Sequence, residues 1–139
     1  DNLSGGYLDN VPPGVFLYTN DLTDAKAVDS IMERQGVDYV YHFAAYAAVG
    51  LSPFIRNFNY SNNILASINL INGSVKYNVK KFIFASSMDV YGEQIPPFTE
   101  DMKPNPQDPY GIAKFAVEMD LANAKRQFGL DYCIIRLNY

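Results

Sequence analysis

Cysteine, histidine and basic residues are scarce in this chain of 139 residues, and each shortage excludes a class of protein. The single cysteine, Cys133, cannot form an intrachain disulfide, and no Cys/His group has zinc-binding spacing. Its place in an apolar run predicts a small buried side chain. The net charge of −4 at pH 7 gives no electrostatic support for non-specific binding to nucleic acid.

Long hydrophobic runs are also missing. No apolar stretch approaches the roughly 20 residues that a membrane helix needs, and no signal-peptide pattern opens the chain. Hydrophobic residues make up 48% of the sequence and charged residues 19%, which is typical of a globular protein. We therefore expect a single domain that is cytoplasmic and has neither a membrane nor a nucleic acid as partner.

Short apolar runs of strand length alternate with longer amphipathic segments. The apolar runs cover residues 15–18, 37–45, 81–87 and 131–137. Helices are predicted between them, over residues 24–36, 52–78 and 109–129. This alternation predicts right-handed βαβ units and a parallel sheet. The expected fold class is α/β, with a Rossmann-like doubly wound parallel sheet.

Local signals mark the ends of these elements. Asp24 is a favourable residue before a helix, and Gly36 and Gly129 are favourable residues after one. Pro109 suits the first turn of the last helix. Residues 37–45 are mostly apolar on both faces, which predicts a central strand of the sheet.

Two further features concern the loops and the ends of the chain. Prolines interrupt residues 88–108, and long loops without regular structure tend to be functional. The chain opens with a strand-exit loop, Asp1–Gly6, and stops directly after a predicted strand. We therefore expect an incomplete segment of a longer chain that lacks its first βα unit.

Tyr110 and Lys114 stand four residues apart at the start of the last predicted helix, so they share one face of it. A free phenol has a pKa near ~10 and is a poor base at neutral pH. A neighbouring ammonium favours the phenolate, which can then exchange a proton with a substrate hydroxyl. Such a pair, taken alone, is most often only part of a helix surface.

Ser86 and Ser87 lie at the carboxyl end of the predicted strand 81–87, at the edge where open α/β sheets bind their ligands. A hydroxyl at this edge could hydrogen-bond a reacting oxygen and relay its proton to Tyr110. The alternative is that both serines only cap the end of the strand.

Six ordered segments resemble those of the extended short-chain dehydrogenase/reductases, within the branch of NAD-dependent nucleotide-sugar epimerases and dehydratases. These segments are Asp1–Ser4, Asn20–Leu22, His42–Ala45, Asn62–Asn63, Phe82–Gly92 and Asp108–Lys114. The resemblance implies that Tyr110 is the acid/base for the sugar hydroxyl. It implies that Ser87 helps to position this hydroxyl and to relay its proton. It implies that Lys114 lowers the pKa of the tyrosine and holds the nicotinamide ribose. No metal is implied.

The resemblance also implies NAD as the cofactor. The carboxylate of Asp1 would accept hydrogen bonds from the ribose hydroxyls and repel a 2′-phosphate, which favours NAD over NADP. The implied cofactor-binding positions are Asp1, Asn2, Ser4, Asp21, Leu22, Phe43, Ala44, Ala45, Asn62, Tyr110 and Lys114. The implied substrate-binding positions are Ser87, Met88 and Asp89. Residues 1–139 would form the central and C-terminal part of an NAD-binding domain, without the glycine-rich phosphate loop and the C-terminal substrate domain.

The activity implied is a 4-epimerase-like reaction on a nucleotide sugar, with a UDP-sugar as the expected substrate and a homodimer as a possible assembly. Hydride would pass between the sugar C4 and NAD through a 4-keto intermediate. A dehydratase, decarboxylase or ketoreductase of the same family is an alternative, although Met88 stands where the 4,6-dehydratases have an acid. A non-catalytic sensor or scaffold is another, and it would be expected to lose Ser87, Tyr110 or Lys114. His42 is expected to be a packed, neutral imidazole.

Overall fold

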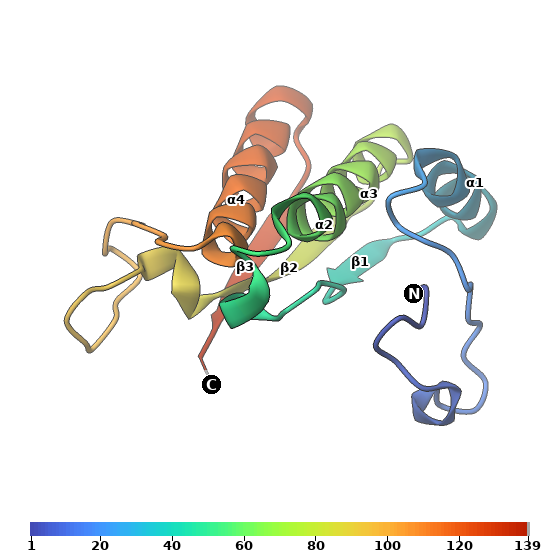
Figure 1. Ribbon diagram of the computed structural model, residues 1–139. Helices are drawn as coiled ribbons and strands as arrows, with labels where there is room; N and C mark the ends of the chain where they lie inside the picture. Colours follow the sequence, from blue (N-terminus) through green and yellow to red (C-terminus); the bar gives the residue numbers. More distant parts are fainter. Residues whose placement is uncertain (139) are drawn as a thin grey trace.

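The computed structural model describes residues 1–138 and contains a parallel sheet with helices packed on one face (Figure 1). The strands are β1 (Tyr39–His42), β2 (Lys81–Ser87) and β3 (Tyr132–Leu137), hydrogen-bonded in the order β1-β2-β3. The helices are α1 (Ala25–Gln35), α2 (Arg56–Tyr60), α3 (Ala66–Lys76) and α4 (Pro109–Phe128). Both strand pairs are parallel, so the predicted Rossmann-like α/β sheet is confirmed.

The ends of α1 and α4 follow the predicted capping signals. Asp24 accepts hydrogen bonds from two backbone amides of α1, and Gly36 ends that helix in the left-handed region at φ 55°. Asp108 caps α4 in the same way, with Pro109 in the first turn, and Gly129 ends it at φ 77°. These signals are local in the sequence, which is why they could be recognised without the tertiary structure.

The helix predicted over residues 52–78 begins later and is not uniform. It consists of α2, a π-helical segment (Ser61–Leu65) and α3, which follow one another without a break. A π-helical segment inside an α-helix is frequently found at a functional site. This one lies beside the cavity described below.

The hydrophobic core lies between the sheet and the helices. Phe82 and Phe84 of β2 are almost fully buried, and Val117 and Leu121 of α4 belong to the same cluster. Met32 of α1 belongs to the same cluster. The long apolar side chains thus fix α4 against the central strand, and this contact positions the site.

Three predictions are wrong: that of a strand at residues 15–18, that of a central position for the strand within residues 37–45, and that of a buried Cys133. Residues 15–18 form no strand: the segment has no ladder partner, and Phe16 is 88% exposed. Within residues 1–138, β1 pairs only with β2, so it is an edge strand in which Tyr41 is exposed, not a central strand. Cys133 of β3 is exposed, not buried. Within residues 1–138, no strand pairs with residues 15–18 or with the outer edge of β1, and no second layer covers Cys133.

Among residues 1–138, no helix has both the length and the hydropathy that crossing a bilayer would require.

We predict that Gly92→Ala destabilises the protein strongly. Gly92 has φ 65° at the turn after Tyr91, and a Cβ atom there would lie 2.0 Å from the carbonyl oxygen of Asn105. Backbone strain together with this clash should lower the free energy of unfolding by about 2–4 kcal/mol. Urea unfolding of the purified protein measures this, with Gly50→Ala as the control because a Cβ at Gly50 meets nothing within 4 Å. Equal stability of the two variants would contradict the prediction.

Candidate active site and cofactor cavity

The three predicted catalytic residues lie where β2, the following turn and α4 meet. Ser87 is the last residue of β2 and is followed by a 3-10 turn (Met88–Tyr91). The first turn of α4 packs directly against this turn, because a Cβ atom on Gly111 would come 2.7 Å from the carbonyl oxygen of Asp89. Glycine at this position therefore lets the backbone that carries Tyr110 approach the segment that begins at Ser87.

The hydroxyl of Ser87 is held by Asp89. It donates to Asp89 Oδ2 at 2.8 Å and accepts from the Asp89 backbone amide at 3.2 Å. Ser87 is 1% exposed, so its orientation is set by this turn. Asp89 was predicted only as a substrate contact, but the Ser-x-Asp spacing is itself the signal for such a local side-chain turn.

Lys114 is a buried ammonium beneath the candidate site. Its side chain donates to the carbonyl oxygen of Ala85 at 2.7 Å and lies 4.9 Å from the ring centre of Phe84. It lies 5.6 Å from the ring centre of Tyr110. Burial lowers the pKa of Lys114 to about 8. The ammonium lies within cation–π range of the Tyr110 ring.

His42 is buried and neutral, as predicted. Its Nε2 lies 2.8 Å from the hydroxyl of Ser67, and that hydroxyl donates to the carbonyl oxygen of Asn63 at 2.7 Å. The hydroxyl proton is thereby used, so Nε2 must carry the proton that it shares with Ser67. Burial, and then the charge of Lys114, lowers the pKa of His42 to about 4. The imidazole therefore holds α3 to β1 and is not a base at neutral pH.

A second buried charge anchors α4 one turn beyond Lys114. Glu118 accepts from Ser86 Oγ at 2.5 Å and from both Nε and Nη2 of Arg136, at 3.0 and 2.7 Å. The guanidinium of Arg136 also lies 4.7 Å from the ring centre of Tyr91. Neither Glu118 nor Arg136 was predicted as part of the site. The repeat of polar residues at every fourth position from Tyr110 was the available signal.

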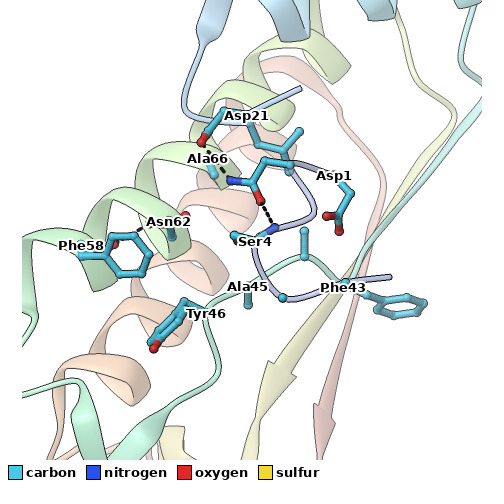
Figure 2. A pocket seen from close by; sticks show the side chains of 14 residues that line it. Asp1, Ser4, Asp21, Phe43, Ala45, Tyr46, Phe58, Asn62 and Ala66 are labelled. Atoms are coloured by element: carbon cyan, nitrogen blue, oxygen red, sulfur yellow. Dashed lines mark hydrogen bonds between the residues drawn. The ribbon is translucent and has the colours of Figure 1, made fainter. Parts of the chain in front are cut away.

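A cavity of about 410 Å³ lies at the carboxyl end of β1 (Figure 2). It is lined by Asp1, Asn2, Ser4, Gly5, Gly6, Asp21, Leu22, Phe43, Ala44, Ala45, Tyr46, Phe58, Asn62 and Ala66. Nine of the predicted cofactor-binding residues are therefore gathered around one space. The other two, Tyr110 and Lys114, are not among its lining residues and lie on α4.

Carboxylates and short turns form one rim of the cavity. Asp1 Oδ1 accepts from the amide of Leu3 at 2.6 Å, and Asn2 donates to Asp21 at 3.0 Å. Hydrogen bonds from Thr23, and more weakly from Asn2, lower the pKa of Asp21. Two ionised carboxylates at this rim favour a ligand that presents hydroxyl donors over one that presents a phosphate.

The opposite wall comes from the segment after β1 and from the π-helical segment. Tyr46 and Phe58 pack edge to face, with ring centres 4.9 Å apart. The ring of Phe43 points away from the cavity, and Phe43 is 60% exposed (Figure 2). This predicted cofactor-binding residue therefore does not line the cavity with its ring. Asn62 lines the cavity, whereas Asn63, which was not predicted separately, binds both the amide and the carbonyl of Tyr46.

Comparison with known proteins agrees with this geometry. The family model described as the NAD dependent epimerase/dehydratase family matches residues 3–138. The chain belongs to this family. Because the match spans nearly the whole chain, the resemblance inferred from the six sequence segments is confirmed.

Individual relatives in this family are nucleotide-sugar epimerases. A UDP-glucose 4-epimerase of Lactobacillus helveticus is 36% identical over 139 residues, which is 98% of this chain and 42% of that protein. The UDP-glucose 4-epimerase of Thermotoga maritima, solved with UDP-glucose, has a TM-score of 0.94 at 37% identity. The match covers 98% of this chain and 45% of that one. The Thermus thermophilus enzyme, solved with NAD, has a TM-score of 0.93 at 33% identity over 98% and 45% of the two chains. The chain thus spans less than half the length of these relatives.

We predict that Lys114→Met stabilises the ligand-free protein at neutral pH. In the unfolded chain, Lys114 keeps its proton up to about pH 10.5, whereas in the folded protein it keeps the proton only up to about pH 8. Burial of the charge is therefore unfavourable at neutral pH, and its removal should raise the thermal midpoint by about 2–4 °C. The advantage should shrink as the pH rises from about 8 toward 10.5, because the unfolded chain alone binds the proton in this window.

Thermal unfolding monitored by circular dichroism at several pH values tests this. Lys125→Met is the control, because Lys125 is half exposed and paired with Asp131. A midpoint for Lys114→Met that stays equal to that of the unaltered protein at every pH would contradict the prediction.

Proposed function

We propose that the full-length protein is an NAD-dependent nucleotide-sugar 4-epimerase that acts on UDP-sugars. One observation supports the proposal: the first turns of α4, which carry Tyr110 and Lys114, pack against the turn that follows Ser87 at the carboxyl end of β2. A cavity lies at the carboxyl end of the neighbouring strand β1. The names of the relatives support the same reaction. In the whole protein, this chain would supply the central and C-terminal part of the NAD-binding domain.

The cavity fits part of a dinucleotide. Asp1 and Asp21 provide acceptors for ribose hydroxyls, and Gly5 and Gly6 leave room for a ligand to approach the backbone. Asn62 offers an amide at the opposite wall. NAD, when bound, supplies a site that takes up a hydride from the sugar and returns it.

The chain's own residues would then handle the proton and the orientation of the sugar. Tyr110, as the phenolate, would accept the proton of the sugar 4-hydroxyl while the C4 hydrogen leaves as hydride, which gives a 4-keto sugar. Ser87 would hydrogen-bond the same oxygen and keep it within reach of Tyr110. Lys114 would stabilise the phenolate during the oxidation. Return of the hydride to the opposite face of C4, with return of the proton from Tyr110 to the C4 oxygen, would complete the epimerisation.

The alternative chemistries have less support. A 4,6-dehydratase needs an acid beside the catalytic hydroxyl to expel water, and Met88 cannot donate a proton. Asp89 is the neighbouring carboxylate, but it already accepts the hydroxyl proton of Ser87. A sensor or scaffold does not require a buried ammonium under a tyrosine ring, which is unfavourable for stability.

We predict that Tyr110→Phe lowers the turnover number for interconversion of UDP-glucose and UDP-galactose by about 10²–10⁴-fold, because the phenol oxygen is the proton acceptor. The dissociation constant for NAD should change by less than about twofold, since the ring remains in place. Coupled assays of sugar interconversion and a fluorescence titration with NAD measure the two quantities. Tyr39→Phe, at an exposed tyrosine of β1, is the matched control. Unchanged turnover in Tyr110→Phe would remove this residue from the mechanism.

We also predict that Asp1→Asn weakens the preference for NAD over NADP in the full-length protein. Removal of the carboxylate abolishes its repulsion of a 2′-phosphate, so the ratio of the two dissociation constants should move toward unity by about tenfold. Titration with both nucleotides measures the ratio. Asp9→Asn, at another exposed aspartate of the N-terminal segment, should leave it unchanged. The role of Asp1 is refuted if both variants keep the original ratio.

A further inference from the structure

Two buried asparagines lie between the cofactor cavity and α4. Asn59, in α2, is 0% exposed, and Asn63, in the π-helical segment, is 2% exposed. Buried amides are unfavourable unless their donors and acceptors are paired. Their partners therefore show what these two residues hold together.

The hydrogen bonds of these amides form a continuous path. Asn63 Oδ1 accepts from the amide of Tyr46 at 2.7 Å, and its Nδ2 donates to the Tyr46 carbonyl at 3.0 Å. The same Nδ2 donates to Asn59 Oδ1 at 2.8 Å. Asn59 Nδ2 donates to the carbonyl oxygen of Pro109 at 2.9 Å. The path thus runs from Tyr46, in the cavity wall, to the residue that precedes Tyr110.

Helix formation does not require the last bond of this path. The carbonyl of Pro109 is in the first turn of α4, where it accepts the helical hydrogen bond from an amide four residues later. A carbonyl oxygen has a second lone pair, and Asn59 uses it. An apolar side chain of similar volume could fill the same space and leave no helix carbonyl unpaired. The side-chain amide of Asn59 therefore fixes where the first turn of α4 lies, and it is not needed to complete the helix.

We infer that Asn59 is a positioning residue that holds the first turn of α4 at a defined distance from the cavity wall. This inference rests on the proposed function, because the residue it positions is Tyr110. Tyr110 must reach a sugar that is bound beside the cofactor, and an error of about 1 Å in such a placement can cost two orders of magnitude in rate. Asn59 acts through the backbone of Pro109 and does not itself touch the reacting atoms.

The first test is Asn59→Leu in the full-length protein. We expect the turnover number for UDP-glucose to fall about 10- to 100-fold, while the KM and the NAD dissociation constant change less than about twofold. In the background of Tyr110→Phe, the same substitution should cause no further loss, because its effect passes through Tyr110. Ser74→Ala is the control: Ser74 is also fully buried on the same helical stretch, but its hydroxyl donates to the Leu70 carbonyl of its own helix. A purely structural role for Asn59 predicts a lower melting temperature with normal turnover, and that result would overturn the inference.

Asn59→Asp is the second variant, and it keeps the shape of the side chain. The carboxylate cannot donate to Pro109, whereas the protonated acid can. Turnover relative to the unaltered enzyme should therefore recover as the pH falls. Loss of turnover that does not depend on pH would contradict positioning through this bond.

Hydrogen exchange provides a readout that does not depend on sugar chemistry. On addition of NAD, we expect peptides covering residues 44–48 and 109–113 to gain protection together. In Asn59→Leu, only the peptide at 44–48 should do so. If the unaltered protein binds NAD with this joint protection but turns over no UDP-sugar, the proposed activity fails while the link through Asn59 stands. If the two peptides respond in the same way in the variant, the link fails whatever the activity.

Discussion

The burial of the Lys114 ammonium is the constraint on which the rest of the site depends. A charge placed among aromatic rings and one carbonyl is unfavourable unless the surrounding structure holds it there. That structure is α4, which is capped by Asp108, packed by Leu121 against the core and anchored by Glu118 to the ends of β2 and β3. The same helix carries the tyrosine, so the position of the ammonium also decides the position of the phenol. Stability is given up at Lys114 and regained in the core around it.

The parallel sheet places the cavity and the candidate catalytic residues at the ends of two neighbouring strands. The carboxyl end of β1 opens into the cavity, and the carboxyl end of β2 presents Ser87 to α4. Because parallel strands end at the same edge, the two sites are adjacent without any long connection between them. The helical stretch that contains the π-helical segment borders both, since Asn63 holds the cavity wall and Asn59 reaches α4. This stretch is thus the physical link between the cofactor side and the chemistry.

The face of the sheet opposite the helices is apolar; in the described residues its two outer strands are exposed, whereas Ile83 and Ala85 of the central strand are buried. Tyr41 of β1 and Cys133, Ile135 and Leu137 of β3 lie on it. Parallel sheets are ordinarily covered on both faces. Residues 1–138 provide only one helical layer, and the relatives are more than twice as long as this chain. The described residues therefore leave this face of the sheet without a covering layer.

The sequence by itself determined the elements and residues whose signals are local. The bounds of α1, β2 and α4 follow from caps, glycines and an apolar run, and the pairing of Tyr110 with Lys114 follows from helical periodicity. Only the tertiary structure decided which faces are covered, so the exposure of Cys133 and the edge position of β1 could not be predicted from the chain. It also decided the roles of Asn59, Glu118 and Arg136, whose partners lie 18 to 50 residues away. No sequence pattern identified the partners of these three residues, because such contacts depend on how separate elements pack, although helical spacing placed Glu118 on the face of Tyr110 and Lys114.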